Sequence, residues 1–490
     1  MSTPDWVKDA IFYQIFPDRF AKSGHNPASS LPFESWDSAP THHGFKGGDL
    51  FGVIEKLDYI QDLGCSAIYL NPIFASASNH RYHTFDYYNV DPLLGGNDAL
   101  KKLLKEAHKR GMRVILDGVF NHASRGFWQF HHVLETGQNS PYKDWFYFDE
   151  ERLNGKKHWG AYPTPHEQKV LQHEDSLTTI GYRAWWNIPA LPKFNTSTPA
   201  VREFLFEVAE YWIKFGIDGW RLDVPAEIDD DEFWREFRRR VRAVNPNAYI
   251  VGEIWHEAQR WLQGDQFDAV MNYLFTAASL SFFAGSHLNM DVVSAAGGIK
   301  DRVHNINAIE FANELDRILN LYPAEITFAQ LNLLDSHDMP RFLSCVNGDK
   351  NALKLAFLLM FTLPGAPCIY YGDEIGMDGG HDPECRKSFP WELKDKWDID
   401  LLEFTKACTA LRTKYISLRR GVYKRLYAEG EVMAFERTHQ KERLIISLNT
   451  SNEVKTIELD FNKKPSVLFG KPKISGNKIT IPPRSGIVLA

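Results

Sequence analysis

Carboxylic acids stand at the ends of several short apolar segments of this 490-residue sequence. Asp117, Asp223 and Glu253 each end such a segment, and another one ends with the pair His337 and Asp338. If the segments are parallel strands of one barrel, their carboxyl ends meet at one mouth, where the acids repel one another. A fold gains no stability from collecting like charges, so the pattern favours a chemical role. One more segment brings two acids to the same kind of position, Asp373 and Glu374.

Residues 219–224 carry the most informative of these acids. Trp220, Leu222 and Val224 alternate with Arg221 and Asp223, which is the period of two of a β-strand with one apolar face. A buried carboxylate is costly without a partner, and Arg221 lies on the same face two residues away. Taken alone, the segment is explained equally well by an ion pair that only stabilises the core. The acids at the other strand ends favour a functional site.

Three kinds of chemistry use several carboxylates at one place. The first is metal-assisted hydrolysis, with His122, His337 and the acids as ligands. No pair of histidines stands at a recognisable ligand spacing, such as HxH on a strand or HExxH on a helix, so we expect no metal site. The second is glycoside hydrolysis, which needs one ionised and one protonated carboxyl group. The third is a barrel that binds sugar without catalysis.

Under the second alternative, the surroundings of the acids assign their roles. Arg221 favours the ionised form of Asp223, which a nucleophile needs. Burial and neighbouring negative charge raise the pKa of Glu253 and keep it protonated, as a general acid requires. We therefore predict Asp223 as the nucleophile and Glu253 as the acid and base. Asp338 then holds the sugar hydroxyls and stabilises the oxocarbenium-like transition state.

The elements that must position these acids alternate between strand and helix along most of the chain. Short apolar runs are followed by segments with apolar residues at helical spacing, such as residues 198–215. Eight strand–helix units in a row predict an α/β fold of the closed (β/α)8, or TIM, barrel type. The predicted strands are residues 10–16, 67–74, 112–120, 219–224, 248–255, 269–275, 328–335 and 368–371.

Two regions depart from this alternation. Residues 122–193 have no long apolar periodicity and are too many for a loop, so we expect an inserted domain B after the third strand. From residue 413, short strand-like segments separated by turn residues predict a C-terminal antiparallel β-sandwich. The predicted division is 1–121 and 194–412 for the barrel, 122–193 for the insertion and 413–490 for the β domain.

Composition narrows the class of protein. A net charge of -7 argues against nucleic-acid binding, and no stretch is long and apolar enough for a membrane span. The many arginines of the helix near residues 229–242 follow acids at its start, which suits a solvated helix. Aromatic residues reach 13%, and their flat faces suit sugar rings. Five scattered cysteines and an N-terminus without an apolar core predict a cytoplasmic protein.

Four motifs at the strand ends resemble those of the α-amylase superfamily of glycoside hydrolases. They are Asp117-Gly-Val-Phe-Asn121-His122, Gly219-Trp-Arg221-Leu-Asp223-Val, Gly252-Glu253-Ile-Trp255-His256 and Leu334-Asp-Ser-His337-Asp338. Two further segments, residues 191–195 and 365–374, support the resemblance, which covers nearly the whole chain. The motifs are most similar to the branch of neopullulanases, cyclomaltodextrinases and maltogenic amylases, which includes debranching enzymes.

This resemblance implies a retaining hydrolase of α-glucans that works through a covalent glycosyl-enzyme on Asp223. Maltodextrins, pullulan, cyclodextrins and the branches of glycogen or starch are the expected substrates, cleaved at α-1,4 and also at α-1,6 bonds. A glucanotransferase or a sucrose-type isomerase on the same scaffold, and a non-catalytic sugar-binding homologue, are the alternatives. The implied substrate-binding residues are Arg221, His122, His337, Tyr82, Asn121, Trp255, Glu227, Asp382 and Arg386.

Several positions depart from the pattern of that branch. His83 stands where an aspartate is usual, and Pro225 follows the nucleophile segment, so linkage and acceptor preference are open. The chain starts almost at the first barrel strand, so we expect the N-terminal domain of the branch to be absent and the protein to be a monomer or homodimer. Relatives often bind calcium near the first strand, but only Gly47 and Asp49 remain here as plausible ligands, and we expect no cofactor.

Overall fold

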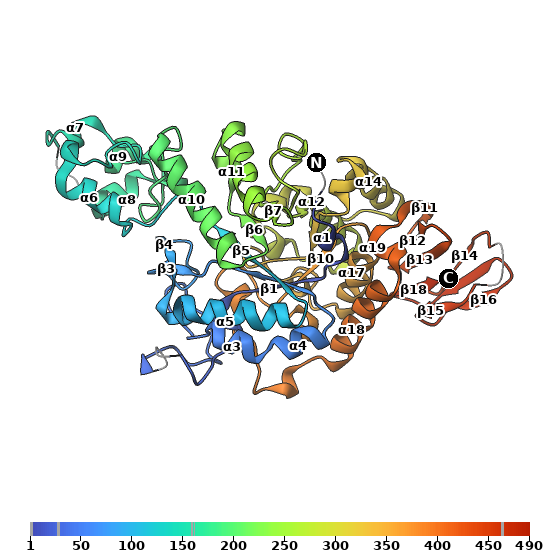
Figure 1. The fold of residues 1–490 in the computed structure, drawn as a ribbon. Helices are drawn as coiled ribbons and strands as arrows, with labels where there is room; N and C mark the ends of the chain where they lie inside the picture. Colours follow the sequence, from blue (N-terminus) through green and yellow to red (C-terminus); the bar gives the residue numbers. More distant parts are fainter. Residues whose placement is uncertain (1–2, 27–29, 158–159, 161, 462–464) are drawn as a thin grey trace.

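The computed structural model describes residues 3–26, 30–157, 160, 162–461 and 465–490. Its centre is a sheet of eight parallel strands in the order β8-β7-β6-β5-β2-β1-β10-β9. A parallel bridge between Met271 and Leu331 joins the two outer strands, so the sheet closes into a barrel (Figure 1). The strands are β1 (Phe12–Ile15), β2 (Ala67–Leu70), β5 (Arg113–Gly118), β6 (Gly219–Leu222), β7 (Tyr249–Gly252), β8 (Ala269–Val270), β9 (Leu331–Leu333) and β10 (Ala366–Tyr370).

Helices surround the barrel, and the predicted α/β barrel fold is confirmed. The side chain of Asp49 caps the N-terminus of helix α3 (Leu50–Glu55) by accepting a hydrogen bond from the N–H of Gly52. The larger helices are α3 (Leu50–Glu55), α4 (Leu57–Asp62), α5 (Gly96–Lys109), α10 (Pro199–Phe215), α11 (Asp231–Val244), α12 (Tyr273–Phe283), α14 (Ala308–Asn320), α17 (Lys350–Thr362) and α18 (Ile399–Lys414). The shorter ones are α1 (Asp5–Asp9), α2 (Pro17–Phe20), α13 (Met290–Val293), α15 (Ala324–Thr327), α16 (Phe342–Cys345) and α19 (Ile416–Arg420).

The sixth barrel strand is shorter than the sequence pattern predicts. We expected a strand over residues 269–275, but β8 ends at Val270 and α12 begins at Tyr273. The cause is Asn272, whose side chain accepts a hydrogen bond from the N–H of Phe275 and caps the helix. Residues 269–275 are apolar apart from Asn272, because the strand and the start of the helix are both buried. Without a polar face there is no periodicity from which the end of the strand could be predicted.

Strands β5, β6 and β7 are buried on both faces, so they hold the acids at their ends in fixed positions. Close approach between β6 and β7 depends on Gly219, since a Cβ atom there would lie 2.2 Å from the carbonyl oxygen of Tyr249. Arg221 pairs in register with Asp117 of β5 and with Val251 of β7. The strand ends that carry Asp117, Asp223 and Glu253 therefore lie side by side.

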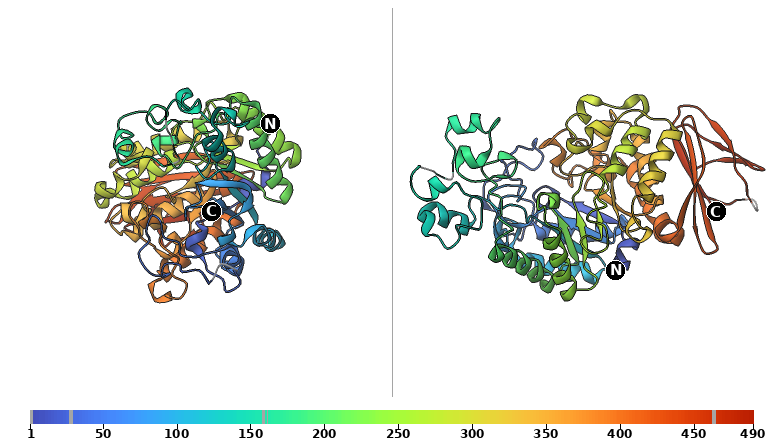
Figure 2. Two further views of the ribbon diagram at one scale, coloured as in Figure 1. Left: turned by 90° about the vertical axis from the view of Figure 1, so that its left-hand side faces the viewer. Right: turned by 90° about the horizontal axis from the view of Figure 1, so that it is seen from above.

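The segment after β5 is mostly irregular, with the short helices α6 (Trp128–Thr136), α7 (Glu150–Leu153), α8 (Pro165–Val170) and α9 (Ser176–Ile180). An isolated bridge of His122 with Lys193 ties its two ends together. Stacked rings form its core, including Phe130 on Phe148. Figures 1 and 2 show it at one end of the molecule, and in Figure 1 it lies above the hairpin of β3 (Phe74–Ser76) and β4 (Thr84–Val90).

The C-terminal part forms two antiparallel sheets at the opposite end of the molecule (Figures 1 and 2). A separate hydrophobic cluster, with Ile457 and Ile479 from one sheet and Ile487 from the other, packs between them. The sandwich is therefore confirmed. Its strands are β11 (Val422–Glu429), β12 (Val432–His439), β13 (Glu442–Asn449), β14 (Lys455–Glu458), β15 (Val467–Phe469), β16 (Lys473–Ser475), β17 (Lys478–Ile481) and β18 (Ser485–Leu489).

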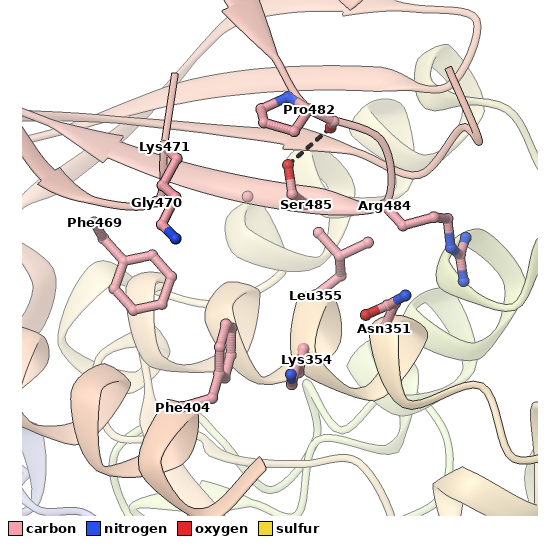
Figure 3. Close-up of a pocket in the computed structure, with 11 residues that line it drawn as sticks. Asn351, Lys354, Leu355, Phe404, Phe469, Gly470, Lys471, Pro482, Arg484 and Ser485 are labelled. Atoms are coloured by element: carbon pink, nitrogen blue, oxygen red, sulfur yellow. Dashed lines mark hydrogen bonds between the residues drawn. The ribbon is translucent and has the colours of Figure 1, made fainter. Parts of the chain in front are cut away.

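A cavity of about 390 Å³ lies at the seam between α17, α18 and the C-terminal sheets (Figure 3). Its apolar side is formed by Leu355, Phe404 and Phe469, and the two phenyl rings meet edge to face. At its other end Arg484 forms an ion pair with Asp349. Within the described ranges, each helix is too short or too polar to cross a membrane.

Candidate active site

Arg221 is the centre of the cluster at the strand ends. Its fully buried guanidinium places NH1 2.8 Å from Oδ1 of Asp117 and 3.1 Å from Oδ1 of Asp223. Its NH2 lies 2.9 Å from Oε2 of Glu253. One cation therefore binds three carboxylates that come from three adjacent strand ends. The site differs from the sequence-based interpretation, in which Arg221 serves Asp223 alone.

The pKa values of the two acids at the ends of β6 and β7 are both raised. Burial raises the pKa of Glu253 to about 7, against the opposing pull of Arg221, and the charge of Asp338 adds to the rise. Burial also raises the pKa of Asp223 above its usual range, and Arg221 again opposes this. Since one guanidinium is shared by three carboxylates, it does not neutralise them all. The pair of Asp223 and Glu253 therefore retains a proton near neutral pH.

A strained backbone positions Glu253. Val224 has a φ of 35°, in the left-handed region that a β-branched residue rarely adopts. In this conformation its N–H donates a hydrogen bond of 3.0 Å to Oε2 of Glu253. The indole N–H of Trp255 donates to Oε1 of the same side chain over 3.2 Å. Strain of this kind persists where surrounding contacts enforce it, and it is concentrated at functional sites.

Asp338 has the opposite electrostatic character. Its carboxylate lies 3.0 Å from Nε2 of His337 and 3.1 Å from NH2 of Arg386. Burial raises its pKa, but His337 and Arg386 outweigh burial and hold the pKa of Asp338 well below its usual range. Arg386 also donates from Nε to the carbonyl of His337 and forms an ion pair with Asp382. Asp338 is thus an ionised carboxylate, with 31% of its side chain exposed.

Tyr82 links Asp117 to the loop that carries His337. Its hydroxyl donates to Oδ2 of Asp117 over 2.8 Å and lies 2.5 Å from Nε2 of His337. The two rings stack with an interplanar angle of 6°. On the other side of the imidazole, the side-chain amide of Gln14 lies 3.0 Å from Nδ1 of His337. Tyr82 and His337 therefore form one wall of the site.

His122 forms another wall. It is fully buried, and its Nδ1 lies 3.2 Å from the amide of Asn121. Its Nε2 and Oδ1 of Asn121 have no hydrogen-bond partner among the residues that the structure describes. Burial lowers the pKa of His122 to about 3, with the charge of His83 adding to the effect. A neutral imidazole with an unpartnered nitrogen can bind a sugar hydroxyl.

Of the two remaining predicted site residues, Trp255 and Glu227, the structure places only the first at the acids. Trp255 touches Glu253 and stacks on Tyr273 at 3.7 Å between ring centroids, so it lies in the site. Glu227 is exposed, and its carboxylate forms an ion pair with Lys193 of the inserted segment. It lies beyond the contact network of the three acids.

Two acids named from the strand-end pattern belong to a different network. Asp373 forms an ion pair with Arg341 over 2.8 Å, and Glu374 accepts hydrogen bonds from the hydroxyls of Tyr13 and Tyr59. Both are buried, and Glu374 also accepts from the N–H of Gly372. Among the described residues, no group of three or more His, Cys, Asp or Glu side chains has the arrangement of a metal site.

The structure gives a role to one strand-end acid that the sequence interpretation left without one, and it adds a side chain that the sequence did not indicate. Asp117 accepts from Tyr69, Tyr82 and Arg221, so it fixes the position of the guanidinium. Trp185, in the inserted segment, stacks on His122. The place of Asp117 at a strand end was a usable signal, whereas nothing local to Trp185 indicates its neighbour.

Asp49, one of the two residues left as plausible calcium ligands, binds protein donors with both of its carboxylate oxygens. Both carboxylate oxygens of Asp49 accept hydrogen bonds from Ser23, and Oδ1 also accepts from Gly52. The N–H of Gly47 donates to Asp18. Asp49 is therefore engaged by protein donors, and the expectation of no cofactor stays a prediction.

Comparison with known proteins agrees with this geometry. The model of the alpha amylase catalytic domain matches residues 14–400. A cyclomaltodextrinase of Geobacillus thermopakistaniensis is 45% identical over 466 residues, 94% of this chain and 72% of that protein. Neopullulanase 2 of Thermoactinomyces vulgaris is 43% identical over 463 residues, with 94% and 72% covered. The native structure of the Nostoc punctiforme debranching enzyme superposes with a TM-score of 0.88 at 45% identity, covering 100% of this chain and 99% of that one.

Proposed function

The chain belongs to the α-amylase family of glycosidases, and we propose that it hydrolyses α-glucans with retention of configuration through a covalent glycosyl-enzyme. The observation that carries this proposal is the guanidinium of Arg221 shared between Asp223 and Glu253. Carboxylates bound to neighbouring nitrogens of one guanidinium are held close together. Retaining glycosidases need this close spacing, whereas inverting enzymes leave room for a water molecule between the two groups.

In the first step, Glu253 donates its proton to the glycosidic oxygen while the carboxylate of Asp223 attacks the anomeric carbon. The bond between that carbon and the glycosidic oxygen breaks, and the aglycone leaves as an alcohol. In the second step, Glu253 takes a proton from a water molecule, which attacks the same carbon and releases Asp223. The raised pKa of Glu253, about 7, supports its role as a proton donor near neutral pH.

The side chains around the acids have the chemistry to hold the sugar whose bond is cleaved. Asp338 stays ionised and accepts hydrogen bonds from hydroxyls, and Arg386 and His337 fix its orientation. His122 offers an unpartnered ring nitrogen, and Tyr82 offers a flat face. These contacts strengthen as positive charge develops on the sugar ring, which is where a glycosidase lowers its barrier.

We propose α-1,4 and also α-1,6 glucosidic bonds of maltodextrins, cyclodextrins, pullulan or branched glucans as the substrates. The support is the similarity to a cyclomaltodextrinase, a neopullulanase and a debranching enzyme. A sugar acceptor in place of water in the second step would give transfer products. We further propose a cytoplasmic protein, supported by five buried cysteines that are all free thiols.

Digestion of pullulan, β-cyclodextrin and amylopectin, followed by chromatography of the products, tests the proposal. Panose from pullulan would identify α-1,4 cleavage, maltotriose α-1,6 cleavage, and larger oligosaccharides transfer. Asp223→Asn should abolish turnover and leave the unfolding temperature within a few degrees. Asp98→Asn, at an exposed acid on α5, is the control and should digest like the wild type. A wild-type protein that releases no sugar from any of the three glucans would overturn the proposal.

A further inference from the structure

Three aromatic rings of the inserted segment form a stack that begins beside the acid cluster. The imidazole of His122 stacks on Trp185 at 5.0 Å between centroids and an interplanar angle of 8°. Trp185 stacks on Trp186 at 4.6 Å and 15°. His122 is fully buried, whereas Trp186 is 75% exposed. The stack therefore runs from the wall of the proposed catalytic site out to the surface.

The exposure of Trp186 is enforced by its backbone. Trp186 has a φ of 51° and Asn187 a φ of 57°, so two successive residues that carry side chains lie in the left-handed region. Asparagine tolerates this conformation, whereas tryptophan does so rarely. The Asn187 side chain locks the turn, because it accepts from the N–H of Ser176 and donates to the carbonyls of Leu171 and Glu174. The fold thus keeps a large apolar ring in solvent at the expense of backbone strain.

A second observation also indicates a missing ligand. The indole nitrogen of Trp185 is buried and finds no acceptor in the part of the chain that the structure describes. A buried indole N–H usually has a hydrogen-bond partner. Trp185 stacks against both His122 and Trp186, so both faces of its ring contact protein side chains. Its N–H edge is the part that remains for a hydrogen bond with a ligand. An acceptor such as a sugar hydroxyl would satisfy it.

The ligand that suits both features is a pyranose ring. One side of a glucosyl unit presents C–H groups, which pack on an aromatic face, and its rim carries hydroxyls, which accept hydrogen bonds. We propose that the exposed face of Trp186 and the N–H of Trp185 form an outer subsite for a glucosyl unit of the substrate away from the cleaved bond. This proposal rests on the proposed α-glucan substrate, and it makes Trp186 a determinant of chain-length preference.

The expected consequence is a selective loss of affinity for long chains. Trp186→Ala should lower kcat/KM on maltoheptaose roughly tenfold, through a higher KM, as expected for one lost aromatic contact. The loss on maltotriose should be several times smaller. Trp186→Phe keeps a flat ring and should recover most of the activity on maltoheptaose. Trp128 is the matched control, because it is an exposed tryptophan of the same segment at 60% exposure, and Trp128→Ala should behave like the wild type on both sugars.

Calorimetric titration of the Asp223→Asn protein with maltoheptaose and maltose separates this subsite from the catalytic proposal. Adding Trp186→Ala should weaken maltoheptaose binding roughly tenfold and maltose binding less than twofold. Equal affinities with and without Trp186, or an equal loss with Trp128→Ala, would overturn the subsite. A wild-type protein without turnover would instead overturn the proposed hydrolase activity, and the titration would still decide the subsite.

Discussion

The N–H of Val224 donates a hydrogen bond to Oε2 of Glu253 over 3.0 Å, from a backbone conformation with a φ of 35°. The same oxygen lies 2.9 Å from NH2 of Arg221. Oε1 accepts from the indole N–H of Trp255 over 3.2 Å, so Val224 and Trp255 each hold one oxygen of the carboxyl group. These two hydrogen bonds together fix the orientation of the Glu253 side chain.

The pH dependence of activity should follow the titration of Glu253. Its pKa is raised to about 7 in the free protein, so kcat/KM should fall with rising pH above about 7 as the acid loses its proton. Initial rates on a maltodextrin between pH 4 and 9 measure this limb. An activity that stays constant up to pH 9 would contradict Glu253 as the proton donor.

Stability should respond to the same group. The folded protein binds the proton of Glu253 more tightly than the unfolded chain, because burial raises the pKa from 4.5 to about 7. The stabilisation by this proton is complete below pH 4.5 and is lost as the pH rises through 7, which amounts to roughly 3 kcal/mol. Glu253→Gln carries no titrating group at this position and should not lose this stability. The difference in unfolding free energy, variant minus wild type, should therefore rise between pH 4 and pH 8, as measured by urea denaturation.

Arg386 should act through Asp338. Its guanidinium contacts the carboxylate of Asp338 and the carbonyl of His337, so Arg386→Met removes two charge-assisted hydrogen bonds. We expect kcat/KM to fall about 100-fold, the size of two such bonds lost around a buried charge. Asp382→Asn disturbs only the outer ion pair of Arg386 and should cost about tenfold at most. Steady-state kinetics on one maltodextrin compare the two variants, and equal effects would argue against this role.

Arg412 should matter for stability without affecting the chemistry. It is fully buried in α18 and donates to the carbonyls of Phe361, Leu363 and Leu418. Arg412→Met leaves these acceptors unsatisfied and should lower the unfolding free energy by about 3 kcal/mol. Lys406→Met, at a surface ion pair of the same helix, should change it by less than about 1 kcal/mol. Denaturant titration measures both, and kcat should be the same in the two folded variants.

The sequence predicted the barrel and the position of the acids because both depend on short-range patterns. A period of two identifies each buried strand, and parallel strands in one barrel place their carboxyl ends together. The structure brings these acids together: Asp223 and Glu253 share Arg221, and Asp338 connects to that group through His337, Tyr82 and Asp117.

What the sequence did not predict depends on contacts between distant residues. The sharing of Arg221 among three carboxylates follows from strand register, and it leaves the pKa of Asp223 raised by burial. Asp373 and Glu374 also end a strand, but Arg341 and two tyrosines withdraw them into a separate network. A strand-end position therefore does not by itself place an acid in the site.

The central claim is that Asp223 forms a covalent bond with the sugar, and trapping of that bond tests it most directly. The protein is incubated with 5-fluoro-α-D-glucosyl fluoride, which slows hydrolysis of the intermediate, and is then digested and examined by mass spectrometry. We predict a mass increase of one fluoroglucosyl group on the peptide that contains Asp223, and none in Asp223→Asn. An adduct on Glu253 or Asp338, or rapid turnover by Asp223→Asn, would contradict the assignment.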